Sequence, residues 1–321
     1  MKKTLAALFL ATVLLSFSSC KKDKGDDNNN HPRSAREFMA KHGPQLQTVS
    51  FNTSELPKTI VLRGGTRITI PQNAFTRSGS PVTGTITFNA LEFYKRSDLL
   101  FGGSNTNHIS GAPLETQGSF FLEATQNGVA LDRQLAQPLT ISVPAENNGD
   151  LTAIWEGQIG GVGGAQQLGW APARMPNGAV EVRAFNEAFT FNFGQLGWVN
   201  CDVFYSNASP KTTITVDVNN NPGALASFRG YTGETFVFYC PNDANVTAQL
   251  YTPDGPNRVK SYDNMMPIGS QGKLLVFSIK DGNYYLASKD ITITADLHES
   301  VTLTESSEAA IQSAIEALDN Y

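Results

Sequence analysis

The sequence predicts a mainly β protein built from two β-sandwich-like modules, with a short helix before the first module and a helix at the end of the second. Two observations predict this fold class. Short segments in which apolar and polar residues alternate recur from about residue 49 to residue 303, and a period of two places the apolar side chains on one face of a strand. Turns rich in glycine, asparagine and proline separate these segments, as expected for strands that cover a shared core.

The chain begins with a segment that predicts export. Two lysines follow Met1, residues 5–17 are apolar, and the small residues Ser18 and Ser19 precede Cys20. An apolar run of this length is too short to span a bilayer and is typical of a signal peptide. The segment resembles a bacterial lipoprotein signal, although Phe17 stands where such signals usually carry leucine. The resemblance implies that residues 1–19 are removed and that Cys20 carries the lipid; an ordinary signal with a chance cysteine is the alternative.

The segment after Cys20 predicts a disordered tether over residues 20–33. It consists of charged residues, asparagines, one glycine, one histidine and one proline, with no large apolar residue, so it cannot bury enough surface to offset the entropy of folding. The thirteen residues after the cysteine, 21–33, reach at most about 45 Å. Its acidic residues, Asp23, Asp26 and Asp27, resemble the post-cysteine segments that direct some lipoproteins of Bacteroidota to the cell surface. We therefore expect a lipid-anchored protein of the outer membrane or cell surface.

Composition limits the partners. Without residues 1–19 the chain has 321 − 19 = 302 residues and a formal net charge of 22 − 29 = −7, because Lys2 and Lys3 are lost. A mildly acidic chain of this kind argues against nucleic acid as a partner. Its length is compatible with two domains.

The first predicted module spans residues 34–145. Ser34 and Glu37 form a capping box, Gly43 and Pro44 end the helix, and we expect that helix to pack on the first sheet. Strands are predicted where apolar residues alternate, around Ile68 and Ile70, Ile86 to Ala90, Phe120 to Ala124, and Leu139 to Val143.

This module contains a motif of Gly-Thr-x-Ile-x-Ile-Pro-x-Asn-Ala-Phe, followed by Val-x-Gly, a strand with glutamate, Ser-Asp, and a Glu-x-x-Gly strand. The matching residues are Gly65, Thr66, Ile68, Ile70, Pro71, Asn73, Ala74, Phe75, Val82, Gly84, Glu92, Ser97, Asp98, Glu115 and Gly118. The motif resembles a recurrent module of Bacteroidota envelope proteins, and residues 65–75 are distantly similar to the ZU5 β-sandwich. The resemblance implies a cell-surface β-module with no established chemistry.

A connecting hairpin is predicted over residues 146–178. Its glycine-rich loop, residues 157–164, lacks the Lys-Ser/Thr and the following helix of a phosphate-binding loop. The second module is predicted over residues 179–321. Its final helix would be capped by Thr304, and Ile311, Ala314, Ile315 and Leu318 form one apolar stripe that we expect to dock on the second sandwich.

Two cysteines remain in the folded part. Cys201 and Cys240 both fall on apolar faces of predicted strands. Outside the inner membrane a disulfide between them is allowed, and two buried free thiols fit the pattern as well. The four histidines form no zinc or cysteine-protease signature.

Four residues are candidates for ligand contact. Glu92 and Asp98 could serve carboxylate chemistry, and Trp155 and Trp170 could stack on a sugar if they are exposed. The alternative is that the acids lie in solvated loops or strand ends and that the tryptophans are buried. We therefore expect a non-catalytic interaction or structural module, without cofactor or metal, that contacts the membrane through Cys20 and a protein or glycan through its folded part. The alternative is a carbohydrate-binding protein or small hydrolase whose site assembles from dispersed carboxylates and tryptophans.

Overall fold

The structure is a computed structural model that describes residues 31–144, 153–160, 167–175, 178–185, 188–205, 209–225 and 233–320. The predicted signal peptide, Cys20 and most of the tether lie outside these residues. His31–Tyr321 form one compact unit. In the part that the structure describes, every helix is too short or too polar to cross a membrane.

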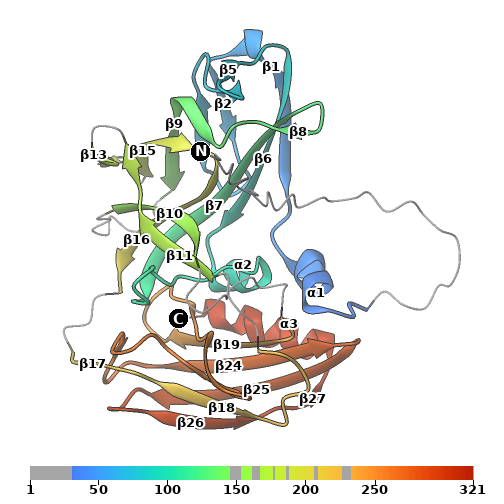
Figure 1. Ribbon diagram of the computed structural model, residues 1–321, viewed down its shortest axis with the longest axis vertical. Helices are drawn as coiled ribbons and strands as arrows, with labels where there is room; N and C mark the ends of the chain where they lie inside the picture. The colour runs from blue at the N-terminus through green and yellow to red at the C-terminus, as the bar shows by residue number, and fades with distance from the viewer. Residues whose placement is uncertain are drawn as a thin grey trace, which may run out of the picture. The chain divides into compact units, whose positions relative to one another are not determined.

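The N-terminal half of this unit is a sandwich of two sheets (Figure 1). The first sheet has the order β1-β6-β7-β16-β10-β11, with β8 beside β7. Its strands are β1 (Gln47–Asn52), β6 (Thr85–Phe93), β7 (Leu114–Gln126), β8 (Val129–Ala130), β10 (Ala153–Gly160), β11 (Gln167–Pro172) and β16 (Gly197–Phe204). The second sheet has the order β14-β15-β9-β3-β2. Its strands are β2 (Lys58–Val61), β3 (Arg67–Ile70), β9 (Gln134–Pro144), β14 (Val182–Phe185) and β15 (Ala188–Gln195).

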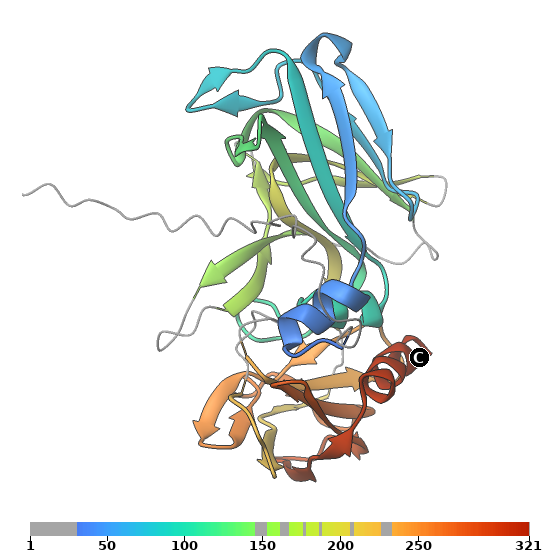
Figure 2. The same cartoon turned by 90° about the vertical axis from the view of Figure 1, so that its right-hand side faces the viewer.

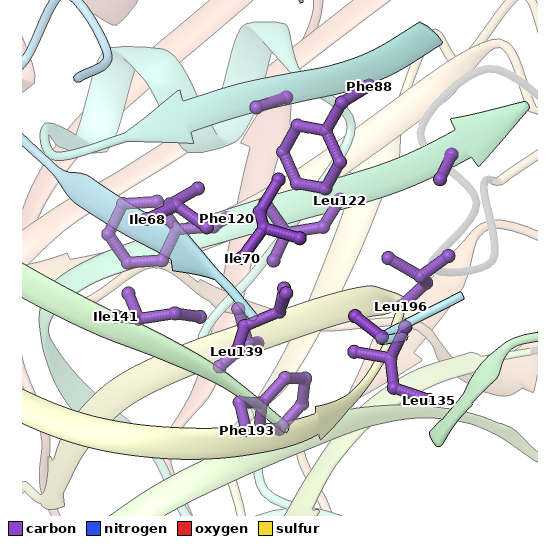
Figure 3. Packing of buried hydrophobic residues seen from close by; sticks show 14 of the residues in the cluster. Ile68, Ile70, Phe88, Phe120, Leu122, Leu135, Leu139, Ile141, Phe193 and Leu196 are labelled. Carbon is purple, nitrogen blue, oxygen red and sulfur yellow. The ribbon is translucent and has the colours of Figure 1, made fainter. Parts of the chain in front are cut away.

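The core of the sandwich lies between these two sheets. The residues that alternate in the sequence supply it, because each strand turns its apolar set toward the other sheet. Ile68, Ile141 and Phe193 come from the second sheet and meet Phe120 and Leu122 of the first, as Figure 3 shows. All five side chains are buried. The mainly β, sandwich-like fold is therefore as predicted.

The division between the two halves lies later in the chain than predicted. Strands β10 and β11 come from the predicted connecting hairpin, but β10 pairs with β16 in the first sheet. Strands β14, β15 and β16 fall inside the predicted second module, yet β15 pairs with β9 and β16 pairs with β7. The N-terminal half therefore extends to about residue 205 instead of ending at residue 145.

The C-terminal half contains two further sheets. One has the order β21-β22-β18-β26, in which β18 and β26 are parallel. The other has the order β20-β19-β24-β25-β27. Their strands are β18 (Thr215–Asn219), β19 (Thr235–Pro241), β20 (Ala248–Gln249), β21 (Thr252–Gly255), β22 (Arg258–Lys260), β24 (Gln271–Lys280), β25 (Asn283–Thr292), β26 (His298–Thr302) and β27 (Thr304–Ser306).

Helices form a third layer on the C-terminal half, where the sequence predicted the last helix but not α1 and α2. Every residue of β19 is buried, because the strand is covered on both faces. Val237 and Tyr239 face the core between the two sheets. Phe236 and Phe238 face a separate core lined by helices α1 (Ala35–His42), α2 (Arg96–Phe101) and α3 (Glu308–Glu316). These three helices gather where the two halves meet (Figures 1 and 2).

The first helix forms as predicted but packs elsewhere. Ser34 accepts a hydrogen bond from the Glu37 N–H at 3.2 Å and caps α1. Its buried residue Phe38 joins the core on the C-terminal half with Phe236, although α1 was expected on the first sheet. The first helix of the folded unit therefore packs against strands that come near the end of the chain.

The last helix docks on the C-terminal half as predicted. Ile311, Ile315 and Leu318 are buried in the helix-lined core. The cap is Ser307, whose hydroxyl accepts from the Ala310 N–H at 3.2 Å, whereas Thr304 was predicted. Thr304 lies in β27 because its backbone pairs with Leu286 of β25.

The remaining elements are short. They are η1 (Thr53–Glu55), β4 (Thr76–Arg77), β5 (Ser80–Pro81), β12 (Arg174–Met175), β13 (Gly178–Ala179), β17 (Lys211–Thr212), β23 (Met266–Pro267) and η2 (Ala317–Asp319).

Candidate functional site

Glu92 holds a turn of the sandwich instead of facing solvent. It lies on β6 and is 8% exposed. Its carboxylate accepts hydrogen bonds from the Gln47 side chain at 2.8 Å and from the Gly64 N–H at 2.8 Å. The motif residue Thr66 bonds to Tyr94 beside it. Glu92 therefore fixes the loop between β2 and β3 to the first sheet.

Asp98 caps a helix. It accepts from the backbone N–H groups of Tyr94 at 3.0 Å and Lys95 at 3.1 Å, at the start of α2. Burial raises the pKa of Asp98, and the two backbone hydrogen bonds oppose that shift. Glu92 thus holds a loop and Asp98 caps a helix, and neither is an acid in a solvated loop.

The two candidate tryptophans are buried. Trp155 is 2% and Trp170 is 0% exposed. Their indole N–H groups donate to the backbone carbonyls of Asp202 at 2.9 Å and Asn105 at 2.7 Å. Neither ring can stack on a sugar in this arrangement. Trp198 is partly exposed and lies edge-on to Trp170.

The two cysteines are not paired. Both Cys201 and Cys240 are free and buried. Cys201 belongs to the sandwich core, and Cys240 belongs to the helix-lined core of the C-terminal half. Burial raises the pKa of the Cys240 thiol to about 12, so both positions are structural in this arrangement.

A cavity opens at the end of the sandwich where β1 and β6 meet the motif loop. Its volume is about 460 Å³. Motif residues Asn73, Ala74, Phe75, Val82 and Gly84 form much of its wall. Asn73 has φ 56°, a left-handed conformation that asparagine tolerates better than most residues. The other lining residues are Asn52, Thr53, Ser54, Leu56, Gln72 and Thr83.

The side chains that line this end cavity carry no charge. Several of the lining residues are already engaged with one another. Gln72 donates to the Leu56 carbonyl at 3.1 Å, and the Thr53 hydroxyl accepts from the Gly84 N–H at 3.0 Å. Its walls combine uncharged hydrogen-bonding groups with apolar side chains, a lining that a small neutral group could contact.

A second, polar hollow lies at the side of the sandwich. It also has a volume of about 460 Å³ and is lined by Arg133, Gln134, Glu156, Gln158 and Gln195. Gln158 donates to Glu156 at 2.9 Å, and Gln195 donates to the same carboxylate. Planar amide, carboxylate and guanidinium groups of this kind recognise hydroxyl-rich ligands through hydrogen bonds.

The structure also contains a buried polar cluster that the sequence did not predict. Asp202 on β16 is fully buried and accepts from Asn200, whose carbonyl oxygen accepts from the Thr116 hydroxyl at 2.8 Å. Burial, reinforced by the nearby charge of Glu115, raises the pKa of Asp202 well above its usual range. A β-bulge between Asn200 and Asp202 brings these residues together. A bulge that shifts the alternation by one residue cannot be seen in the sequence pattern.

Charged groups meet where the predicted tether joins the folded unit. Glu308, at the start of α3, contacts Lys41 at 2.7 Å, His42 at 2.7 Å and His31 at 2.8 Å. Its side chain is 11% exposed. Burial alone would raise the pKa of Glu308, but hydrogen bonds from Lys41, His31 and His42 outweigh it and lower the pKa to about 2.

In the ranges that the structure describes, no group of three or more histidine, cysteine or acidic side chains is arranged to hold a metal ion. With the fold and these sites in view, neither a scan against protein-family models nor a search of curated proteins finds a match for the chain.

Proposed function

We propose that this protein is a lipid-anchored envelope lipoprotein that acts as a non-catalytic interaction module at the outer membrane or cell surface. Residues 14–30 support the anchor, since an apolar run ends at Cys20 and a polar tether follows. The contacts of Glu308, at the junction of the predicted tether and the folded unit, also support the proposal. His31, the first residue that the structure describes, bonds to Glu308 at the start of the last helix.

This junction suits a chain that is held from its N-terminus. Tyr284 donates to the Pro32 carbonyl, and the Gly282 N–H donates to the Arg33 carbonyl at 2.9 Å. Residues 31–33 are therefore fixed to the C-terminal half, although the sequence predicted a disordered tether there, and the prediction is wrong for these three residues. The end of β1 and the start of β6, which border the end cavity, lie at the far end of the sandwich from α1 and α3 (Figure 1). The tether would then join the folded unit far from that cavity.

The proposal is tested by fractionating cells that express the full chain. Cys20→Ala should move the protein from the membrane fraction to the soluble fraction, because lipid attachment needs the thiol. Cys240→Ala is the matched control, since it also removes one thiol but should leave the protein in the membrane. Protease treatment of intact cells then separates surface exposure from burial in the envelope. Membrane association that survives Cys20→Ala would contradict the anchor.

The polar hollow favours a second candidate function, which is glycan binding. Arg133, Glu156 and three glutamines converge there, although Trp155 and Trp170 are buried and do not line it. Titration of residues 21–321 with oligosaccharides, followed by nuclear magnetic resonance, tests this candidate. Chemical-shift changes at Gln158 and Gln195 that disappear in Glu156→Ala would support it, and unchanged spectra would exclude the sugars used.

A further inference from the structure

Strand β1 is an open edge of the first sheet. In antiparallel pairing with β6, Val49 lies opposite Phe88 and Thr53 donates to the Gly84 carbonyl at 2.9 Å. In an antiparallel ladder every second pair of residues is hydrogen-bonded, and the Thr53–Gly84 bond places Val49 in a bonded pair. Thr48 and Ser50 therefore turn their backbone N–H and C=O groups away from β6. Both residues are exposed. Within the described residues these two N–H groups and two C=O groups make no backbone hydrogen bond outside the β1–β6 ladder.

Other sheet edges of the described structure carry protection that β1 lacks. Proteins shield exposed edges with short strands, charges, prolines, bulges or covering loops. Residues 105–109 cover β11 and the end of β20, through bonds such as Trp170 N–H to the Asn107 carbonyl at 2.9 Å. The other edges carry Lys58 in β2, Arg183 in β14, Pro253 and a bulge in β21, Glu299 in β26, and Glu305 in β27.

By contrast, β1 is an unprotected edge. Its six residues, Gln47–Asn52, contain no charge and no proline. Its register with β6 runs without a shift from Gln47 to Asn52. One side chain, Val49, is only partly buried and packs at the margin of the sandwich core. A strand of this kind is a template for another strand.

We propose that β1 is a self-association surface, on which β1 of a second copy of this chain adds antiparallel to form one continuous sheet. The strand is complementary to itself about a two-fold axis at Val49. In that register Thr48 faces Ser50 of the second copy, and each such pair exchanges both backbone hydrogen bonds. Val49 faces Val49 of the second copy in the close, non-hydrogen-bonded position.

The side chains fit this register on both faces of the sheet. Thr48 and Ser50 lie on the outer face, where Thr48 already donates to Asn89 at 2.8 Å and Ser50 contacts Thr87 at 3.3 Å. Thr–Ser pairs across strands are favourable. On the inner face, two valines cover each other's exposed side. No like charges meet, because β1 carries none. A two-fold contact of this type closes at two copies.

Substitutions at the two-fold axis give the sharpest test. Residues 21–321 are studied by sedimentation and amide exchange from about 10 µM to about 1 mM, a range that covers weak association. The wild type should shift from monomer to dimer, and the Thr48 and Ser50 amides should become protected as the concentration rises. Val49→Lys alone and Val49→Glu alone should remain monomeric, because like charges would oppose each other. An equal mixture of the two variants should form a dimer.

Proline at the outward-facing positions supplies the control. Ser50→Pro removes an N–H that β6 does not use and should abolish the dimer, whereas Thr59→Pro makes the same change on edge strand β2 and should leave it intact. Circular dichroism and thermal unfolding establish that each variant is folded. A wild-type chain that stays monomeric throughout the range would overturn the proposal. So would a dimer that survives Ser50→Pro, or a mixture of Val49 variants that does not associate.

Discussion

At the scale of single residues, side chains that look suited to chemistry are mostly used to hold the fold. Glu92 ties a loop to a strand and Asp98 caps a helix. Trp155 and Trp170 donate to buried carbonyls. The sequence pattern marks these residues as unusual, but it does not show what they contact. Except for Asp98, their partners are backbone groups far away in the sequence.

Glu308 offers a pH-dependent test at this scale. Its pKa is lowered to about 2 from an ordinary value of 4.5. The ionised form is therefore favoured by folding, so this stability is complete above about pH 4.5 and is lost as the pH falls toward 2. Glu308→Gln should reduce the free energy of unfolding at pH 7 by about 2 kcal/mol, as for a hydrogen-bonded charged group. Urea unfolding at several pH values measures the difference, which should shrink below pH 4.5.

The control for this prediction is Glu305→Gln. Glu305 is exposed and lies on the neighbouring strand β27, so its substitution should change stability little. An equal loss in both variants, or a Glu308→Gln loss that persists unchanged at pH 2, would contradict the role assigned to the Glu308 cluster.

At the scale of elements, alternation identifies strands well but not their neighbours. Strands β6, β7, β9 and β15 follow the period of two and face the core as predicted. Their pairing is set by residues distant in sequence, so the sequence could not show that β15 joins β9 or that β16 joins β7. The uninterrupted apolar run of β19 was the available signal that both faces of its sheet are covered.

Helix α2 depends on one buried arginine. Arg96 is 2% exposed and donates to the Leu318 carbonyl at 3.1 Å, and also to the carbonyls of Pro241 and Ala244. Arg96→Met should lower the free energy of unfolding by roughly 3 kcal/mol, because buried acceptors lose their donor. Urea unfolding measures this, with the exposed Arg63→Met as the matched control. A loss no larger than that of the control would show that Arg96 does not hold the two halves together.

At the scale of the whole molecule, the two halves are joined by a polar seam. Asn245 donates to the carbonyls of Tyr94 at 2.8 Å and Thr116 at 3.1 Å. The Thr106 N–H donates to the Thr247 carbonyl at 3.1 Å. The helices add a shared apolar core beside this seam. Each half contains hydrogen-bonding groups whose partners lie in the other half. We therefore expect the two halves to unfold together.

The two buried cysteines report on this coupling. Cys201 marks the core of the N-terminal half, and Cys240 marks the helix-lined core of the C-terminal half. Pulsed alkylation of residues 21–321 in increasing urea, read by mass spectrometry, should label both thiols over the same range of concentration. If Cys240 became reactive well before Cys201, or the reverse, the halves would be independent domains.

The anchor at Cys20 is tested most directly by mass spectrometry of the mature N-terminus, on protein purified from membranes. We expect the chain to begin at Cys20, with a diacylglycerol on its sulfur. An unmodified N-terminus, or cleavage at another residue, would contradict the proposal that the protein is a lipoprotein.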